Sequence, residues 1–157
     1  MEILLSERSQ KVKPSPTLAM NARAKELAAK GGDIISLSVG EPDMDTPSHI
    51  KAAAIQAIET GFTKYTAVDG TPQLKEAIIH KLQTENELSY KPEQIIVSAG
   101  AKQSLYNLFQ AYLNPGDEVL IPAPYWVSYP DMVLLAEGTP KIIQTSLQNQ
   151  FKITPEK

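Results

Sequence analysis

The chain has 157 residues, a length typical of one domain, with the 42% hydrophobic and 21% charged residues of an ordinary soluble globular protein. Its formal net charge of −3 offers no basic excess to neutralise phosphates, which argues against a nucleic-acid partner. The absence of cysteine excludes a disulfide framework and a cysteine metal site, and it fits a reducing compartment.

Residues 1–14 predict an extended or loosely packed arm. Its apolar piece, Ile3 to Leu5, is too short for the core of a secretory signal. No apolar run in the chain approaches the length of a membrane-spanning helix. We therefore expect a cytoplasmic protein that does not contact a membrane.

Helix starts are marked by Ser or Thr followed by Pro, which offer an N-cap and then proline at the first helical position. This signature stands at Ser15-Pro16, Thr46-Pro47 and Thr71-Pro72, and a further helix is expected to be capped by Ser128 in a capping-box variant with Asp131. The apolar residues predicted to face inward on these four helices are, in chain order, Met20, Ala24, Leu27 and Ala28; Ile50, Ala53, Ala54, Ala57 and Ile58; Leu74, Ala77, Ile78 and Leu82; and Val133 and Ala136.

Short apolar runs between these helices predict strands. They are Ile34–Val39, Ile95–Val97, Glu118–Ile121 and Lys141–Thr145. Strands that alternate with helices indicate βαβ units and a mainly parallel sheet, so the predicted fold class is α/β.

The stretch from Ile95 to Leu113 predicts a buried strand, a turn of small residues and then a helix from Lys102. The buried stripe of this helix is expected to be Leu105, Leu108, Phe109, Tyr112 and Leu113. Ser98 to Ala101 carry little side-chain bulk, so a ligand could approach the backbone there, and the helix N-terminus would attract an anion. An ordinary strand-to-helix turn without a ligand is the alternative.

The end of the chain repeats the cap signature at Thr154-Pro155-Glu156. It predicts a helix start without the helix, which we interpret as a truncated chain. Thr139-Pro140 carries the same pair, although it leads into a predicted strand.

Four segments occur together in register: SVGEPDMDTP from Ser38, KYTAVDGTPQLKEAI from Lys64, VSAGAKQSLYNLF from Val97 and PGDEVLIPAPYWVSYPDM from Pro115. With them the chain resembles the N-terminal part of class I pyridoxal-phosphate aminotransferases of fold type I, and most of all the bacterial aspartate aminotransferases of subgroup Ib. The resemblance covers nearly all 157 residues but less than half of a family member. It implies an incomplete fold-type-I structure: residues 1–47 as arm, helix and first strand, belonging in part to the small domain, and 48–157 as the first part of the three-layer αβα large domain.

The resemblance also implies where the cofactor pyridoxal 5′-phosphate would bind. Gly100, Ala101 and Lys102 fall on the family's phosphate-binding turn, where backbone N–H groups hold the phosphate. Trp126, the only tryptophan, falls on the residue that lies flat against the pyridine ring and borders the substrate. The alternatives are a solvated surface lysine for Lys102 and a core tryptophan for Trp126.

Two further residues are matched in the same way. Tyr65 corresponds to the tyrosine that reaches the phosphate of the neighbouring subunit, which implies a homodimer with sites at the interface. Gly40 corresponds to the glycine whose backbone contacts the substrate α-carboxylate. An ordinary loop tyrosine and a turn glycine are the alternatives. His49 and His80 are expected at the surface, and no spacing suggests a metal site.

The implied activity is transfer of an amino group from an L-amino acid, aspartate in the first instance, to a 2-oxo acid such as 2-oxoglutarate. The family's Schiff-base lysine, its acidic partner for the pyridinium nitrogen and its substrate-binding arginine lie later in the chain of its members. Here the Ser-Lys context of that lysine is absent and the only arginines are Arg8 and Arg23. We therefore expect the 157 residues alone to be inactive. The alternatives are an aromatic or prephenate aminotransferase, a lyase of the same fold, or a non-catalytic anion-binding module.

Overall fold

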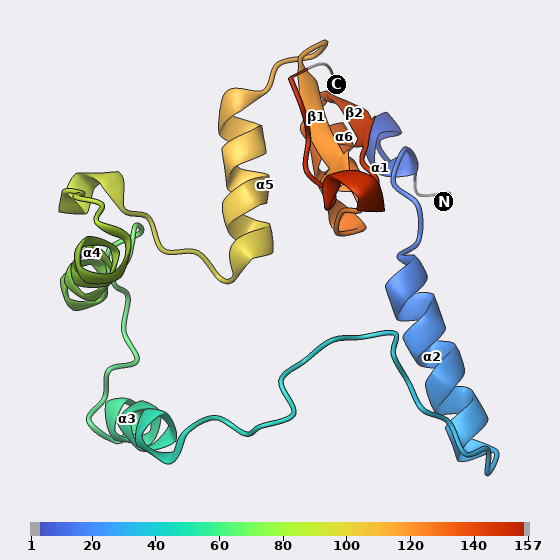
Figure 1. The fold of residues 1–157 in the computed structure, drawn as a ribbon. Helices are drawn as coiled ribbons and strands as arrows, with labels where there is room; N and C mark the ends of the chain where they lie inside the picture. Colours follow the sequence, from blue (N-terminus) through green and yellow to red (C-terminus); the bar gives the residue numbers. More distant parts are fainter. Residues whose placement is uncertain (1–3, 156–157) are drawn as a thin grey trace. The chain divides into compact units, whose positions relative to one another are not determined.

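The structure, a computed structural model, describes residues 4–155 (Figure 1). Contacts within the described residues divide them into two units, one from residues 4–40 and 105–155 and the other from residues 41–104. Each unit is described by itself below. The predicted helix start at Thr154-Pro155-Glu156 reaches beyond the described residues, since Glu156 lies outside them.

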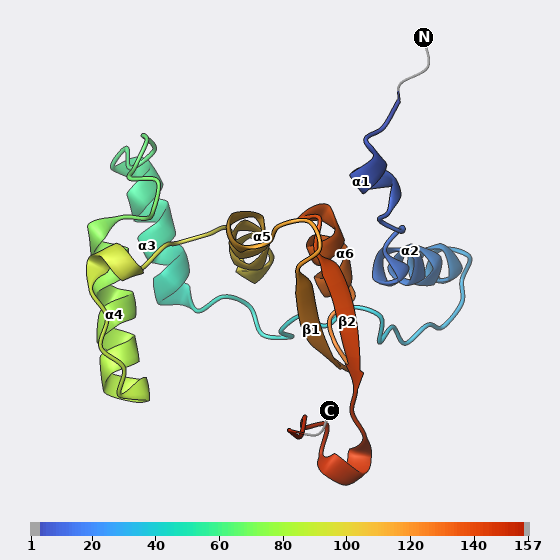
Figure 2. The same cartoon turned by 90° about the horizontal axis from the view of Figure 1, so that it is seen from above.

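The first unit contains a parallel βαβ arrangement. Strands β1 (Glu118–Ala123) and β2 (Thr139–Gln144) pair in parallel, with Glu118 opposite Thr139 and Ala123 opposite Gln144. Helix α6 (Ser128–Leu135) connects them and packs on both, as a crossover between parallel strands must (Figures 1 and 2). The predicted α/β class and parallel pairing are confirmed, and the signature at Thr139-Pro140 does begin a strand.

The buried core of this unit lies between α6 and the sheet. Val133 of α6 is fully buried, and Met132, Ala136 and Ile121 of β1 are at most 7% exposed. The predicted inward positions Val133 and Ala136 are therefore confirmed. Burial of these side chains holds α6 on the strands, because removal of apolar surface from water is the main favourable term in folding.

Val133→Ala is expected to lower the free energy of unfolding by about 2 kcal/mol, because it removes two buried methyl groups and leaves a cavity. Val68→Ala is the matched control, since the Val68 side chain is 98% exposed. Urea unfolding of both variants measures the difference. Equal losses would contradict the position of the core.

Three more helices contribute to the first unit: α1 (Glu7–Gln10), α2 (Pro16–Ala29) and, from residue 105 onwards, α5 (Ala101–Tyr112). The predicted arm therefore contains the short helix α1, which contacts α6. The Ser15 cap is confirmed, because its hydroxyl accepts the N–H of Leu18 at 3.4 Å. A 3₁₀ turn, η2 (Leu147–Asn149), follows β2.

The second unit contains α3 (Ser48–Glu59), α4 (Pro72–Asn86) and the 3₁₀ turn η1 (Pro92–Gln94), which contacts α4. The predicted cap at Thr71 is confirmed, since its hydroxyl accepts the N–H of Leu74 at 3.4 Å. Two predicted caps are wrong. Pro47 holds the N-cap position of α3 in place of Thr46, and Ser128 is the first residue of α6 rather than its cap.

Two predicted strands, Ile34–Val39 and Ile95–Val97, are not strands in this structure. A strand is defined by ladder hydrogen bonds to a neighbour, and β1 and β2 form the only sheet in residues 4–155. Val97 N–H donates instead to the carbonyl of Asp69 in a loop, at 3.0 Å. Extended, β-branched residues alone were therefore not enough to make a strand.

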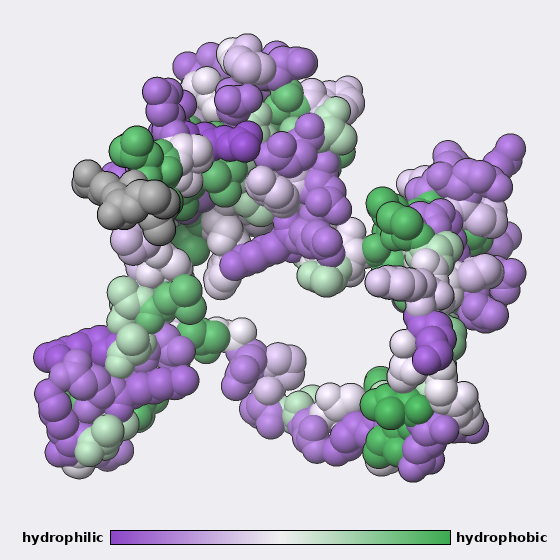
Figure 3. Space-filling model, turned by 180° about the vertical axis from the view of Figure 1, so that it is seen from behind, coloured by the Kyte–Doolittle hydropathy of each residue, from purple (hydrophilic) through white to green (hydrophobic). Residues whose placement is uncertain are grey.

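Several predicted inward faces are exposed in this structure, and Figure 3 shows hydrophobic residues at the surface. On α5, Leu108 and Tyr112 are 53% and 78% exposed, whereas Leu105, Phe109 and Leu113 are half-buried. The other predicted inward residues that the structure exposes are Met20 and Ala28 of α2, Ile50, Ala53, Ala54 and Ile58 of α3, and Leu74 and Ala77 of α4. Within residues 4–155, no helix combines the length and the apolar character needed to cross a bilayer.

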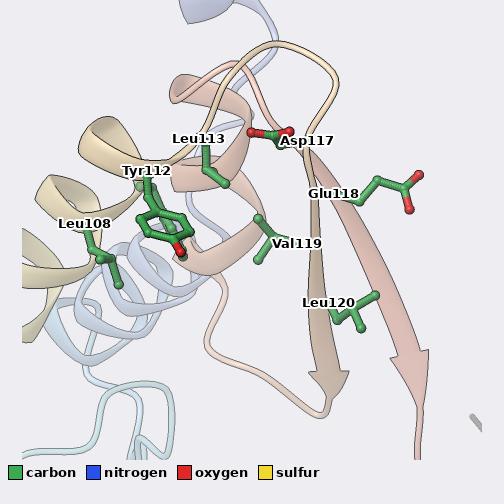
Figure 4. A pocket seen from close by; sticks show the side chains of 8 residues that line it. Leu108, Tyr112, Leu113, Asp117, Glu118, Val119 and Leu120 are labelled. Atoms are coloured by element: carbon green, nitrogen blue, oxygen red, sulfur yellow. The ribbon is translucent and has the colours of Figure 1, made fainter.

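An apolar groove of about 620 Å³ lies between α5 and β1 (Figure 4). It is lined by Leu108, Phe109, Tyr112, Leu113, Asp117, Glu118, Val119 and Leu120. None of the cofactor or substrate residues expected from the sequence lines this groove.

Candidate functional site

The turn before α5 has the geometry expected of a phosphate-binding turn. Gly100 has φ +85°, a conformation that residues with a side chain rarely adopt. A Cβ placed at Gly100 would meet no atom within 4 Å, so the space beside its backbone is open. Helix α5 begins at the next residue, Ala101, and its dipole places partial positive charge at this end.

The hydrogen bonds of the turn determine which donors an anion could use. Gly100 N–H donates to the carbonyl of Ser98 at 2.9 Å, and Ala99 N–H donates to the side-chain oxygen of Gln103. At the start of α5, the N–H groups of Gln103 and Ser104 donate to the carbonyl of Gly100 at 3.1 and 3.3 Å. An anion at this turn would be attracted by the positive end of the helix dipole and would compete with Ser98 for the N–H of Gly100. The turn fits a phosphate group.

Tyr65 lies in the loop before α4, in the same unit as the turn. Its side chain is fully exposed, as a residue that reaches another molecule would be. Its contact with the phosphate of a neighbouring subunit stays a prediction.

Trp126 and Gly40 belong to the other unit, and the structure describes them within it. Trp126 lies in the loop between β1 and α6, and its carbonyl accepts the N–H of Tyr129 at 3.0 Å. Its side chain is 46% exposed, so it is not a core tryptophan here. Gly40 is exposed, and a Cβ added to it would meet no atom within 4 Å. Both residues are thus accessible to a ligand.

The sequence analysis does not predict an ion pair between the buried Lys75 and the half-exposed Asp69. The ammonium of Lys75, in the first turns of α4, pairs with Asp69 and donates to the carbonyl of Pro92 at 3.1 Å. The one local signal is that Lys75 begins a stripe continued by Ile78, Ile79 and Leu82, the half-buried face of α4. The inward face predicted for α4 includes Leu74 and Ala77, which the structure exposes.

The hydrogen bond from Lys75 holds the pKa of the Asp69 carboxyl below its ordinary value of 3.8. A lowered pKa in the folded state adds stability that is complete above the unfolded-state pKa and is lost as pH falls through the folded value. Asp69→Asn is therefore expected to destabilise the protein at pH 7, with the difference from the unsubstituted protein shrinking below about pH 4. Denaturant unfolding at pH 7 and pH 3 measures this, with the exposed Asp43→Asn as control. A difference independent of pH would contradict it.

His49 and His80 are exposed, as expected. In the described part of the chain, no group of three His, Asp or Glu side chains is placed to hold a metal ion.

The comparison with known proteins adds to this geometry. The family model described as "Aminotransferase class I and II" matches residues 32–157. The chain is 60% identical over 152 residues to an aspartate/prephenate aminotransferase of Nitrosomonas europaea, covering 97% of this chain and 38% of the relative. It is 53% identical to an aspartate aminotransferase of a Bacillus species, covering 99% of this chain and 40% of the relative.

The comparison with solved structures also finds aspartate aminotransferases. The aspartate aminotransferase of Rhizobium meliloti matches with a TM-score of 0.93 and 47% identity, over 99% of this chain and 39% of that chain. The Thermus thermophilus aspartate aminotransferase, solved with maleate, matches with a TM-score of 0.93 and 50% identity, over 99% and 41%. The chain thus spans about 40% of the length of these relatives. Since the family model matches most of its residues, this chain belongs to the class I and II aminotransferase family.

Proposed function

We propose that this chain is part of a longer aspartate aminotransferase and supplies the phosphate-binding turn for pyridoxal 5′-phosphate. The observation that carries the proposal is the turn at Gly100, whose positive φ, open flank and adjoining helix start suit a phosphate group. The relatives support aspartate as the amino donor, since each name includes it. Maleate in the Thermus structure is a dicarboxylate, as aspartate is.

Each site residue has a role in this proposal. Backbone N–H groups of Gly100, Ala101 and Lys102 would hold the phosphate, and charge-assisted hydrogen bonds of this kind are the stronger ones. Trp126 would pack on the cofactor ring and fix its plane, a contact worth roughly 0.5–1.5 kcal/mol beyond burial. Bound pyridoxal phosphate supplies the electron sink that amino-group transfer needs.

The substrate and the partner follow from the remaining residues. The Gly40 backbone would contact the substrate α-carboxylate, and Tyr65 would extend to the phosphate of a second subunit, so we propose a homodimer. The proposed location is the cytoplasm, supported by a sequence without cysteine. The domain division at residue 47 concerns the complete protein and stays a prediction.

A second amino acceptor is favoured by the names of the relatives. The Nitrosomonas and Cereibacter sphaeroides relatives, each 60% identical, are both named aspartate/prephenate aminotransferase. Prephenate, which carries a 2-oxo acid group, is therefore the second candidate acceptor beside 2-oxoglutarate.

The experiment is an assay of the complete protein that contains this chain. With aspartate as donor, we expect oxaloacetate to form in the presence of 2-oxoglutarate. A parallel assay with prephenate in place of 2-oxoglutarate tests the second acceptor. Trp126→Ala is expected to lower kcat/KM about tenfold, the equivalent of 1.4 kcal/mol, through loss of the ring contact. Absence of pyridoxal-phosphate-dependent activity with either acceptor would refute the proposed function.

A further inference from the structure

Lys75 is the one charged side chain that the fold buries within residues 4–155. It is 7% exposed, on the face of α4 that it shares with Ile78, Ile79 and Leu82. An ammonium taken out of water costs free energy unless it is paired and hydrogen-bonded. Lys75 finds both partners: the carboxylate of Asp69 before α4, and the carbonyl of Pro92 after it. The ammonium therefore joins two segments that the helix separates in sequence.

The same two segments meet at two further points. The carbonyl of Asp69 accepts the N–H of Val97 at 3.0 Å. A Cβ added to Gly70 would lie 2.5 Å from Cγ2 of Val97, so the Gly70 backbone packs closely on that side chain. Residues 69–70 are thus held to Pro92 by a side chain and to Val97 by the backbone. We call these contacts the Lys75 clamp.

The clamp lies close in sequence to two residues assigned to the cofactor phosphate. Tyr65 is four residues before Asp69, and Gly100 is three residues after Val97. At about 3.6 Å per residue, the chain from Tyr65 to Asp69 spans at most about 14 Å, and the chain from Val97 to Gly100 spans at most about 11 Å. A clamp so near both residues limits where each can lie relative to the other.

We propose that Lys75 is a positioning residue for phosphate binding. By joining Asp69 to Pro92, it holds the loop that carries Tyr65 against the segment that leads to the Gly100 turn. Lys75 does not itself touch the phosphate. This inference rests on the proposed function, in which the turn binds the protomer's own cofactor and Tyr65 reaches that of the second subunit. The clamp then links a protomer's own phosphate turn to the tyrosine it extends to its partner.

A purely structural role for Lys75 makes a different prediction. Lys75→Met keeps an unbranched apolar stem of similar length and removes the ammonium. The Asp69 side chain is 49% exposed, so water can solvate its carboxylate when the lysine is gone. The stability of the protein should therefore change little. Replacing a buried charge by an apolar side chain is costly only when the partner charge is left buried and unpaired. Loss of positioning, by contrast, should weaken binding of the phosphate.

Lys81→Met is the matched control. Lys81 lies on the same helix, its side chain is 52% exposed, and it pairs with Glu85 at 3.4 Å within that helix. The substitution makes the same chemical change without touching the clamp. Asp69→Asn removes the charge that Lys75 pairs with and is itself expected to lower stability at pH 7, so this second variant tests the same contact through the ratio of its affinities for pyridoxal phosphate and pyridoxal. Lys75→Arg keeps a cation that can donate to both acceptors and tests rescue.

The measurement compares dissociation constants of pyridoxal 5′-phosphate and of pyridoxal, which lacks the phosphate, in the complete protein and its variants. The melting temperature of each cofactor-free protein is recorded beside them. Lys75→Met is expected to weaken pyridoxal phosphate about tenfold and to leave pyridoxal unchanged. Asp69→Asn should act in the same direction, Lys75→Arg should restore affinity, and Lys81→Met should match the unsubstituted protein.

Three results would overturn the inference. These are an unchanged affinity for pyridoxal phosphate in the clamp variants, an equal loss for pyridoxal and its phosphate, or an equal effect of Lys81→Met. If the unsubstituted protein does not bind pyridoxal phosphate, the proposed function fails and the inference fails with it. That result is distinguishable, because it concerns the unsubstituted protein and not the variants.

Discussion

The 157-residue chain alone is expected to transfer no measurable amino group from aspartate to 2-oxoglutarate, whereas turnover is expected of the complete protein. The turn at Gly100 can hold a phosphate, but binding alone does not move a proton at the substrate. The family's lysine has no match in the sequence, and its only arginines, Arg8 and Arg23, precede the first matched motif. Without an arginine fork on the substrate α-carboxylate, the substrate is not oriented.

A coupled assay for oxaloacetate measures this, with pyridoxal phosphate in excess. The complete protein at equal concentration is the positive control. Sustained turnover by the 157 residues would contradict the account, because it would mean that the groups required for proton transfer lie within this chain.

Gly70→Ala is expected to lower the free energy of unfolding by about 3 kcal/mol, through backbone strain and a steric clash together. Gly70 has φ +110°, which an alanine adopts only with strain. The new Cβ would also lie 2.5 Å from Cγ2 and 3.0 Å from Cβ of Val97. Denaturant unfolding of the complete protein measures the loss.

Gly61→Ala separates the two causes. Gly61 has φ +78°, but its added Cβ would meet nothing within 4 Å, so about 1 kcal/mol is expected from strain alone. The double variant Gly70→Ala with Val97→Ala should lose less stability than the two single losses combined, since Val97→Ala removes the nearest clashing atom. Strict additivity would contradict the close packing at Gly70.

Elements that depend on local chemistry were predictable from the sequence. Ser15 and Thr71 cap α2 and α4 as expected, because an N-cap needs only a side-chain oxygen within reach of an N–H three residues on. The same signature at Thr46 does not cap α3, where Pro47 holds the N-cap position. Strands depend on partners: β1 and β2 pair, while Ile95–Val97 finds a loop carbonyl instead of a strand.

The residues of the candidate site likewise differ in whether local sequence or distant partners determine them. The turn at Gly100 was predictable as a turn, because one residue's backbone conformation and the start of α5 define it, and its binding of phosphate stays a prediction. Lys75 was missed because its burial depends on acceptors at Asp69 and Pro92, which only the folded chain brings to it. The exposed faces of α3 and α5 likewise could not be foreseen, since amphipathic spacing shows which face is apolar but not what covers it.

The central claim is that the turn at Gly100 to Lys102 holds the phosphate of pyridoxal phosphate. A crystal structure of the complete protein with this cofactor tests it most directly. The account predicts phosphate oxygens at hydrogen-bond distance, about 2.7–3.2 Å, from backbone nitrogens of this turn, with the Trp126 ring against the pyridine ring. A phosphate bound by other residues, with this turn in contact with solvent alone, would contradict it.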